Sequence, residues 1–150
     1  MPSIVFYSTP NNKAEFGSDE DKSSLQQTLV KLVSRRYRSG QRIFVRCCDQ
    51  TQMLELDEAL WKLEADSFLA HSIDGEPSAS QAPILIGTNN PTNMNGFACW
   101  VNLTESALVP IPRTEEIIEF VPNQDEAKAL ARERYKAYCQ QGVKPAFQEL

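Results

Sequence analysis

The sequence predicts one α/β domain over residues 1–150, with helices flanking a mostly parallel sheet. Strand-like and helix-like segments alternate from the N-terminus, which is the order that right-handed parallel crossovers produce. The 150 residues are enough for one compact domain with a sizeable core. Hydrophobic residues make up 41% of the chain and charged residues 23%, as in ordinary soluble globular proteins.

The first two predicted elements are a strand over residues 3–8 and a helix whose apolar positions run from Leu25 to Tyr37. The strand is rich in β-formers, and the helix shows apolar residues at helical spacing. Three arginines occupy the last turn of this helix, where they favour the negative end of its dipole. Gly40 follows in the position of a helix C-cap glycine.

The next two elements are a strand over residues 42–47 and a helix that begins after Asp49. Asp49 is a plausible N-cap. The buried stripe of this helix is predicted to run from Met53 to Leu63. Cys47 and Cys48, which end the strand, are predicted to pack in or near the core.

The second half of the chain begins with a predicted polar loop over residues 72–82. Further strands are expected over 83–87, 97–103 and 117–121. A final helix is predicted over 124–141, because glycine and proline follow it and end it.

The cysteines predict a reducing compartment. Cys47 and Cys48 are adjacent, while Cys99 and Cys139 stand alone. No Cys-x-x-Cys motif occurs and His71 is the only histidine, so we expect free thiols and no metal site. The chain also lacks an N-terminal signal sequence and any apolar run of membrane-spanning length, which predicts a cytoplasmic protein.

An α/β fold invites a nucleotide-binding hypothesis, and the first strand-to-helix loop tests it. That loop contains neither of the glycine-rich phosphate-binding motifs. His71 has no serine or cysteine motif beside it, and a structural or interface histidine is the favoured interpretation. No carboxylates form a recognisable acid/base pair. An enzyme is therefore the minority hypothesis, and no cofactor is expected.

The helix predicted over 124–141 carries cations on one face. Lys128, Arg132 and Lys136 recur every four residues, and Tyr135 lies between the last two. With about 3.6 residues per turn, these four side chains share one face, here called the basic stripe. The whole chain has a net charge of -5, so this stripe indicates a specific acidic partner. A solvated face with Glu/Lys pairing is an equal alternative from spacing alone.

Two aromatic residues mark a second candidate surface. Trp61 lies near the end of the second predicted helix, off its buried stripe, and Phe68 lies in the connection beyond it. Large aromatics in such positions are either a satellite of the core or an interface anchor. The helical pattern alone slightly favours the core.

The chain resembles the chi subunit family of bacterial DNA polymerase III holoenzyme. The resemblance is carried by sequence blocks whose order and spacing fit along most of the chain: Leu56–Trp61 (LDEALW), Ser67–His71 (SFLAH), Gly75–Glu76, Phe120–Pro122 (FVP) and Leu130–Tyr138 (LARERYKAY). The last block is the most specific. Residues 72–96 and the segment after Gly142 fit poorly.

The resemblance implies a non-catalytic adaptor on a nucleotide-binding type of fold that has lost its nucleotide site. It implies two partners, namely the psi subunit of the clamp loader and the acidic C-terminal tail of single-stranded DNA-binding protein, which ends in Pro-Phe. For the tail it implies a site made of Val121 and the basic stripe. For psi it implies an aromatic surface made of Trp61, Phe68, Leu69 and His71.

Two other functions are compatible with an α/β chain of this composition. One is an α/β enzyme or nucleotide-binding protein of unknown substrate, for which the motifs are missing. The other is a direct binder of single-stranded nucleic acid through the basic stripe. The acidic balance of the chain and its few interleaved aromatics disfavour strong nucleic-acid binding.

Overall fold

The computed structural model describes residues 2–8, 19–62, 69–76, 79–91, 96–122 and 124–149. Within these ranges the chain forms three α-helices and seven strands, together with a short 3₁₀ helix. In chain order they are β1 (Ser3–Ser8), α1 (Asp19–Arg38), β2 (Ile43–Arg46), α2 (Gln50–Trp61), β3 (His71–Ile73), the 3₁₀ helix (Ala79–Gln81), β4 (Ile84–Gly87), β5 (Cys99–Asn102), β6 (Glu116–Val121), α3 (Asp125–Gln140) and β7 (Ala146–Glu149).

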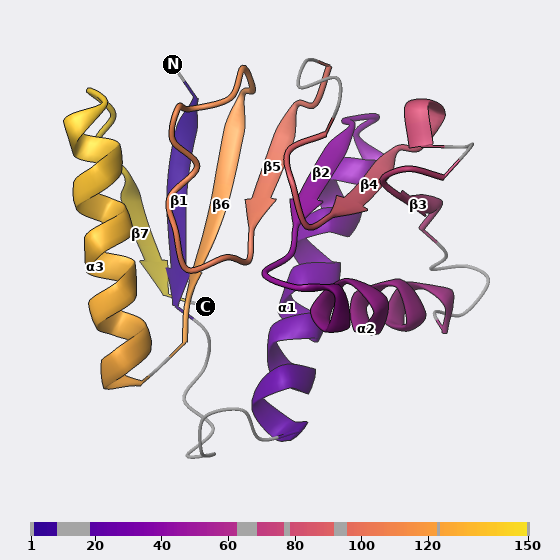
Figure 1. The fold of residues 1–150 in the computed structure, drawn as a ribbon, viewed down its shortest axis with the longest axis horizontal. Coiled ribbons are helices and arrows are strands. Elements are labelled where there is room, and N and C mark those ends of the chain that lie inside the picture. Colours follow the sequence, from indigo (N-terminus) through magenta and orange to yellow (C-terminus); the bar gives the residue numbers. More distant parts are fainter. Residues whose placement is uncertain are drawn as a thin grey trace.

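The strands form one open sheet in the order β3-β4-β2-β5-β6-β1-β7. Every pairing is parallel, so the predicted α/β fold is confirmed. β3 and β7 are the two edge strands. Figure 1 shows α3 at the β7 end of the molecule, away from α1 and α2.

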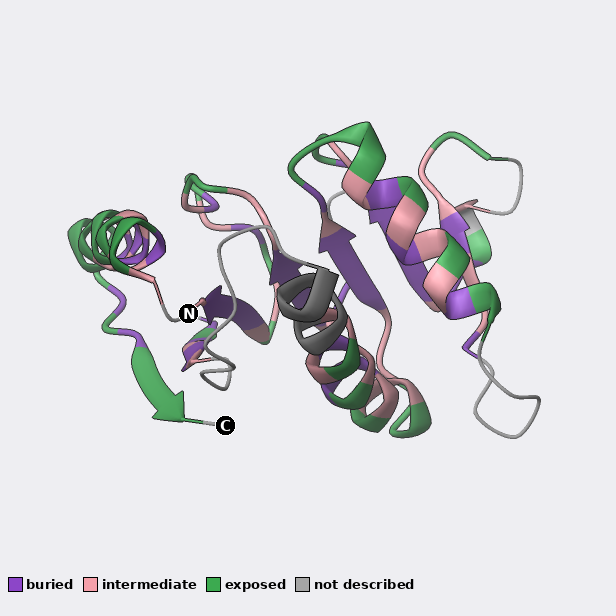
Figure 2. Ribbon diagram, turned by 90° about the horizontal axis from the view of Figure 1, so that it is seen from below, coloured by how far each residue is buried: buried purple, intermediate pink, exposed green. Residues whose placement is uncertain are grey.

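The two faces of the sheet belong to two hydrophobic clusters. Along β1, Tyr7 packs in the cluster that contains α1 and α2, while Ile4 and Phe6 pack in the cluster that contains α3. This alternation follows from the two-residue period of a strand. The central strands are covered on both faces, and Figure 2 shows them buried between the more exposed helices.

Local sequence signals fix the helix ends as predicted. The Asp49 side chain accepts a hydrogen bond from the Gln52 backbone N–H at 2.8 Å, which makes it the N-cap of α2. Gly40 adopts a φ of 79° after α1, a conformation that glycine takes without strain. Arg36 in the last turn of α1 forms an ion pair with Glu116 at the start of β6.

Two expectations were wrong, and one strand was not anticipated. The segment predicted as a polar loop contains most of β3, whose three residues are too few for a strand signal. The strand that was not anticipated is β7, which follows α3; all four of its residues are exposed and show no apolar alternation. Cys48 is exposed, whereas Cys47 is buried as expected. All four cysteines are free, which confirms the predicted thiols. No helix in the described ranges is long and apolar enough to cross a membrane.

Candidate protein-binding surfaces

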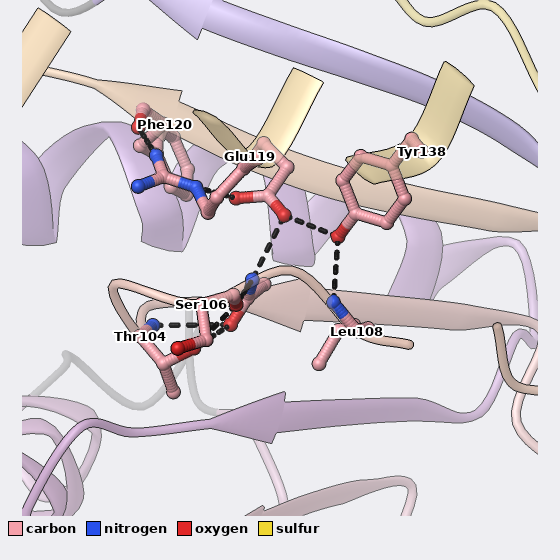
Figure 3. A network of polar contacts seen from close by, with 8 residues as sticks. Thr104, Ser106, Leu108, Glu119, Phe120 and Tyr138 are labelled. Carbon is pink, nitrogen blue, oxygen red and sulfur yellow. Dashed lines mark hydrogen bonds and ion pairs between the residues drawn. The ribbon is translucent and has the colours of Figure 1, made fainter. Parts of the chain in front are cut away.

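A buried polar network fastens α3 to the sheet (Figure 3). Glu119 of β6 is fully buried, and the Arg134 side chain from α3 donates from Nε to its Oε1 at 3.0 Å. Arg134 also donates from Nη2 to the Phe120 carbonyl at 3.0 Å. The Tyr138 hydroxyl and the Asn102 side-chain amide both donate to Glu119 Oε2. The network therefore sets the rotation of α3 about its own axis.

The network also perturbs the ionisation of its members. Burial raises the pKa of Glu119 to about 7, although the charge of Arg134 and the three hydrogen bonds oppose this rise. Burial and the neighbouring Glu119 carboxylate raise the pKa of the Tyr138 hydroxyl. That hydroxyl accepts a hydrogen bond from the Leu108 N–H at 3.1 Å, which ties the loop before β6 to the same cluster.

With α3 oriented in this way, the basic stripe faces outward beside the sheet. Arg132 and Lys136 are exposed, while Lys128 and Tyr135 are half-buried. The Tyr135 ring lies 5.9 Å from the ring of Phe6. Among the described residues, Lys136 pairs with Glu133 at 3.5 Å, whereas Lys128 and Arg132 have no ion-pair partner. Two cations next to an aromatic ring are thus available to an acidic ligand.

Helix geometry gives the direction in which the stripe faces. Successive residues are about 100° apart around the helix axis. The order of side chains around α3 therefore matches the order of the strands that they contact. Arg134 and Tyr138 contact Glu119 of β6, while Tyr135 contacts Phe6 of β1. Continuing in the same sense, the rest of the stripe turns toward β7. Val121, which is 8% exposed, ends β6 on the face that α3 covers.

The sequence is similar to known proteins over most of its length. The sequence matches the family described as DNA polymerase III chi subunit, HolC, over residues 1–146. The chain belongs to the DNA polymerase III chi subunit family. The chi subunit of Escherichia coli (strain K12) is 34% identical over 138 residues, which cover 92% of this chain and 91% of that protein. The chi subunit of Haemophilus influenzae is 31% identical over 119 residues, 79% of this chain and 83% of that protein. The chi subunit of Pseudomonas aeruginosa is 28% identical over 142 residues, 95% of this chain and 92% of that protein.

The aromatic surface of this chi-family chain lies at the β3 edge. Trp61 is 60% exposed at the end of α2, so the slight preference of the helical pattern for a core position was wrong. Its ring lies 5.0 Å from the ring of His71 in an edge-on arrangement. Leu69 is buried. Phe68 lies outside the described residues.

The His71 side chain is buried under the Trp61 ring and supports this surface from the inside. Its side chain is 0% exposed, and its Nε2 lies 3.0 Å from Oδ1 of Asp57 on α2. Its Nδ1 lies 2.9 Å from the Leu69 carbonyl oxygen. Asp57 and Trp61 are one helical turn apart and bracket the imidazole. A partner would therefore meet Trp61 directly and His71 only through it.

A cavity of about 280 Å³ lies at the carboxyl ends of β5 and β6, where open α/β sheets commonly bind ligands. Its lining is mostly apolar and includes Phe120 and Leu130. Glu105 and Glu126 add negative charge, and Arg134 is already engaged by Glu119. This lining is unlike a phosphate site, which uses glycine amides and cations. Within the described part of the chain, no three His, Cys, Asp or Glu residues are grouped as metal ligands would be.

The sequence analysis missed several residues that shape these surfaces. Glu119 interrupts an apolar strand, and such a charge at a core position is a signal for a buried partner. Arg134 lies between the members of the basic stripe, but the structure places it inside and not on the stripe. Asp57 is unremarkable in the sequence, because its role depends on a histidine fourteen residues away.

Proposed function

We propose that this chain is a non-catalytic accessory subunit of the bacterial replicative DNA polymerase. It joins the clamp loader, through the psi subunit, to the acidic C-terminal tail of single-stranded DNA-binding protein, and it acts in the cytoplasm. Membership of the chi subunit family supports this proposal. The observation that carries it is a pair of cations, Lys128 and Arg132, that have no ion-pair partner among the described residues and lie on the same helix face as the Tyr135 ring.

The chemistry of this surface suits an acidic peptide that ends in Pro-Phe. The terminal ring can pack between Val121 and Tyr135, and the terminal carboxylate can pair with the forked guanidinium of Arg132. Acidic residues upstream would meet Lys128 and Lys136. Because α3 is held by buried hydrogen bonds, the peptide binds a preorganised surface and orders little of the protein.

Titration of a fluorescently labelled tail peptide tests this site. Arg132→Ala should weaken binding by about 2–5 kcal/mol, the usual cost of losing a charged hydrogen-bonded partner. Arg113→Ala removes an equally exposed arginine from the loop before β6 and should leave the affinity unchanged. Affinity should also fall as salt rises. Equal affinities for the Arg132 variant and the wild type would show that the tail binds elsewhere.

The psi side of the proposal concerns the aromatic surface. Exposed aromatic anchors contribute a large share of interface energy, and Trp61 is such a residue at the β3 edge. Trp61→Ala should abolish co-purification with psi while leaving tail-peptide binding intact. Arg132→Ala should do the reverse, so each variant is the control for the other. Loss of both partners in either variant would contradict two separate surfaces.

Direct binding of nucleic acid is the competing function of the basic stripe. The net charge of -5 opposes a polyanion, and a short row of cations cannot compensate for it at physiological salt. Bare single-stranded oligonucleotides should therefore not displace the labelled tail peptide. Competition at micromolar oligonucleotide would favour the nucleic-acid function instead.

A further inference from the structure

Phe147 is a large apolar residue on the exposed edge strand β7. It is 60% exposed, and its three neighbours in the strand are exposed as well. Among the described residues, β7 pairs only with β1 and has no strand on its other edge. An exposed phenylalanine at a sheet edge lowers solubility, and such residues often mark a binding surface.

The strand register places Phe147 on the face that α3 covers. Phe147 is the pairing partner of Phe6 in the parallel β1–β7 ladder, and paired residues of neighbouring strands point to the same face. Phe6 packs against Tyr135 and Tyr138 of α3, which identifies that face. Tyr135 contacts Phe6 of β1, the strand that lies next to β7, and the rest of the basic stripe turns toward β7. Figure 1 shows α3 beside β7, so Phe147 should border the same face as Tyr135, from the side of β7.

We propose that Phe147 forms a second apolar wall of the tail-binding surface and contacts the apolar end of the acidic peptide. This inference rests on the proposed function and adds a specificity-determining residue to it. The peptide would lie over β7 beside α3. The apolar residues that precede the terminal phenylalanine would pack between Tyr135 and Phe147.

Charge fixes the orientation of this peptide. Glu149 follows Phe147 by two residues and so lies on the same face of β7, in register with Ser8. A carboxylate there repels aspartates, whereas Lys128 and Lys136 attract them from the helix side. The acidic stretch should therefore follow α3, and only the apolar end should cross toward β7. An acidic peptide with an apolar end matches both sides of the surface, and this complementarity selects it over a purely acidic one.

The test compares Phe147→Ala with Gln148→Ala in titrations of a labelled acidic peptide that ends in Pro-Phe. Gln148 is an exposed neighbour on the same strand, but its side chain points to the opposite face. Phe147→Ala should weaken binding about tenfold, as expected for an aromatic contact at an interface. Gln148→Ala should stay within about twofold, and Phe147→Leu should retain most of the affinity. Melting temperatures should be unchanged in all three variants.

Four outcomes would overturn the inference. Wild-type affinity in Phe147→Ala, with Arg132→Ala still defective, would remove Phe147 from the site and leave the proposed function intact. Equal losses in the Phe147 and Gln148 variants, with a lower melting temperature, would assign the effect to the strand and not to the ring. A wild-type dimer in sedimentation that Phe147→Ala converts to a monomer would make a second copy of the chain the occupant. Failure of the wild type to bind the peptide at all would refute the proposed function as well.

Discussion

Replacing Arg134 with methionine should destabilise the fold far more than an ordinary helix substitution. Arg134 is 6% exposed and Glu119 is fully buried, so solvent cannot replace the lost partner. The variant loses hydrogen bonds to Glu119 and to the Phe120 carbonyl, and it leaves a carboxylate without its cation. Breaking a buried pair from one side costs about 3–5 kcal/mol. For a chain of this length that corresponds to a fall of roughly 6–20 °C in melting temperature.

Urea denaturation at pH 8, where Glu119 is mostly ionised, measures this loss. Arg132→Met is the matched control, because it makes the same change two residues away at an exposed site and should cost less than about 0.5 kcal/mol. The double variant Glu119→Gln/Arg134→Met removes the buried charge and should be more stable than Arg134→Met alone. A loss below about 1 kcal/mol in Arg134→Met, or strict additivity of the two changes, would refute the argument that the pair is coupled.

Three further predictions concern the fold. Glu119 has a pKa of about 7 in the folded chain, above its ordinary value, so the folded state binds the proton more tightly. Its stability contribution is present at acidic pH and is lost as pH rises through about 7; Glu119→Gln should remove this fall in urea denaturation curves between pH 5 and 8. A thiol reagent followed by mass spectrometry should modify Cys48 and Cys139 in the native protein and the two buried cysteines only after unfolding, and equal modification of all four would contradict the described burial. Asp49→Ala should lower the unfolding free energy by about 1 kcal/mol through loss of the α2 cap, whereas an unchanged midpoint would mean that the cap contributes nothing.

The fold could be predicted largely because its strong signals are local. Apolar spacing, the Asp49 cap and the Gly40 terminus each depend on residues within a few positions of one another. β3 and β7 could not be predicted in this way. Their three and four residues are placed by pairing with β4 and β1, and β7 has no buried side chain to produce an alternating pattern.

The surfaces were predictable to a lesser degree. Helical spacing places the basic stripe on one face of α3, but the way in which that face turns depends on contacts of Arg134 and Tyr138 with Glu119. Those contacts join residues 15 and 19 positions apart. Exposure of Trp61 likewise depends on how α2 ends beside β3. Burial arises from tertiary packing, which spacing in a single segment does not encode.

The position of the two edge strands sets the distance between the two proposed binding surfaces. β3 and β7 are the first and last of seven strands. With neighbouring strands about 4.8 Å apart, the two edges are separated by roughly 29 Å. Two partners docked at these edges would contact separate residues, so we expect occupation of one edge to leave the intrinsic affinity of the other unchanged. Any increase in apparent affinity would then come from tethering. When both partners belong to one assembly, binding at one edge raises the local concentration of the second partner at the other edge.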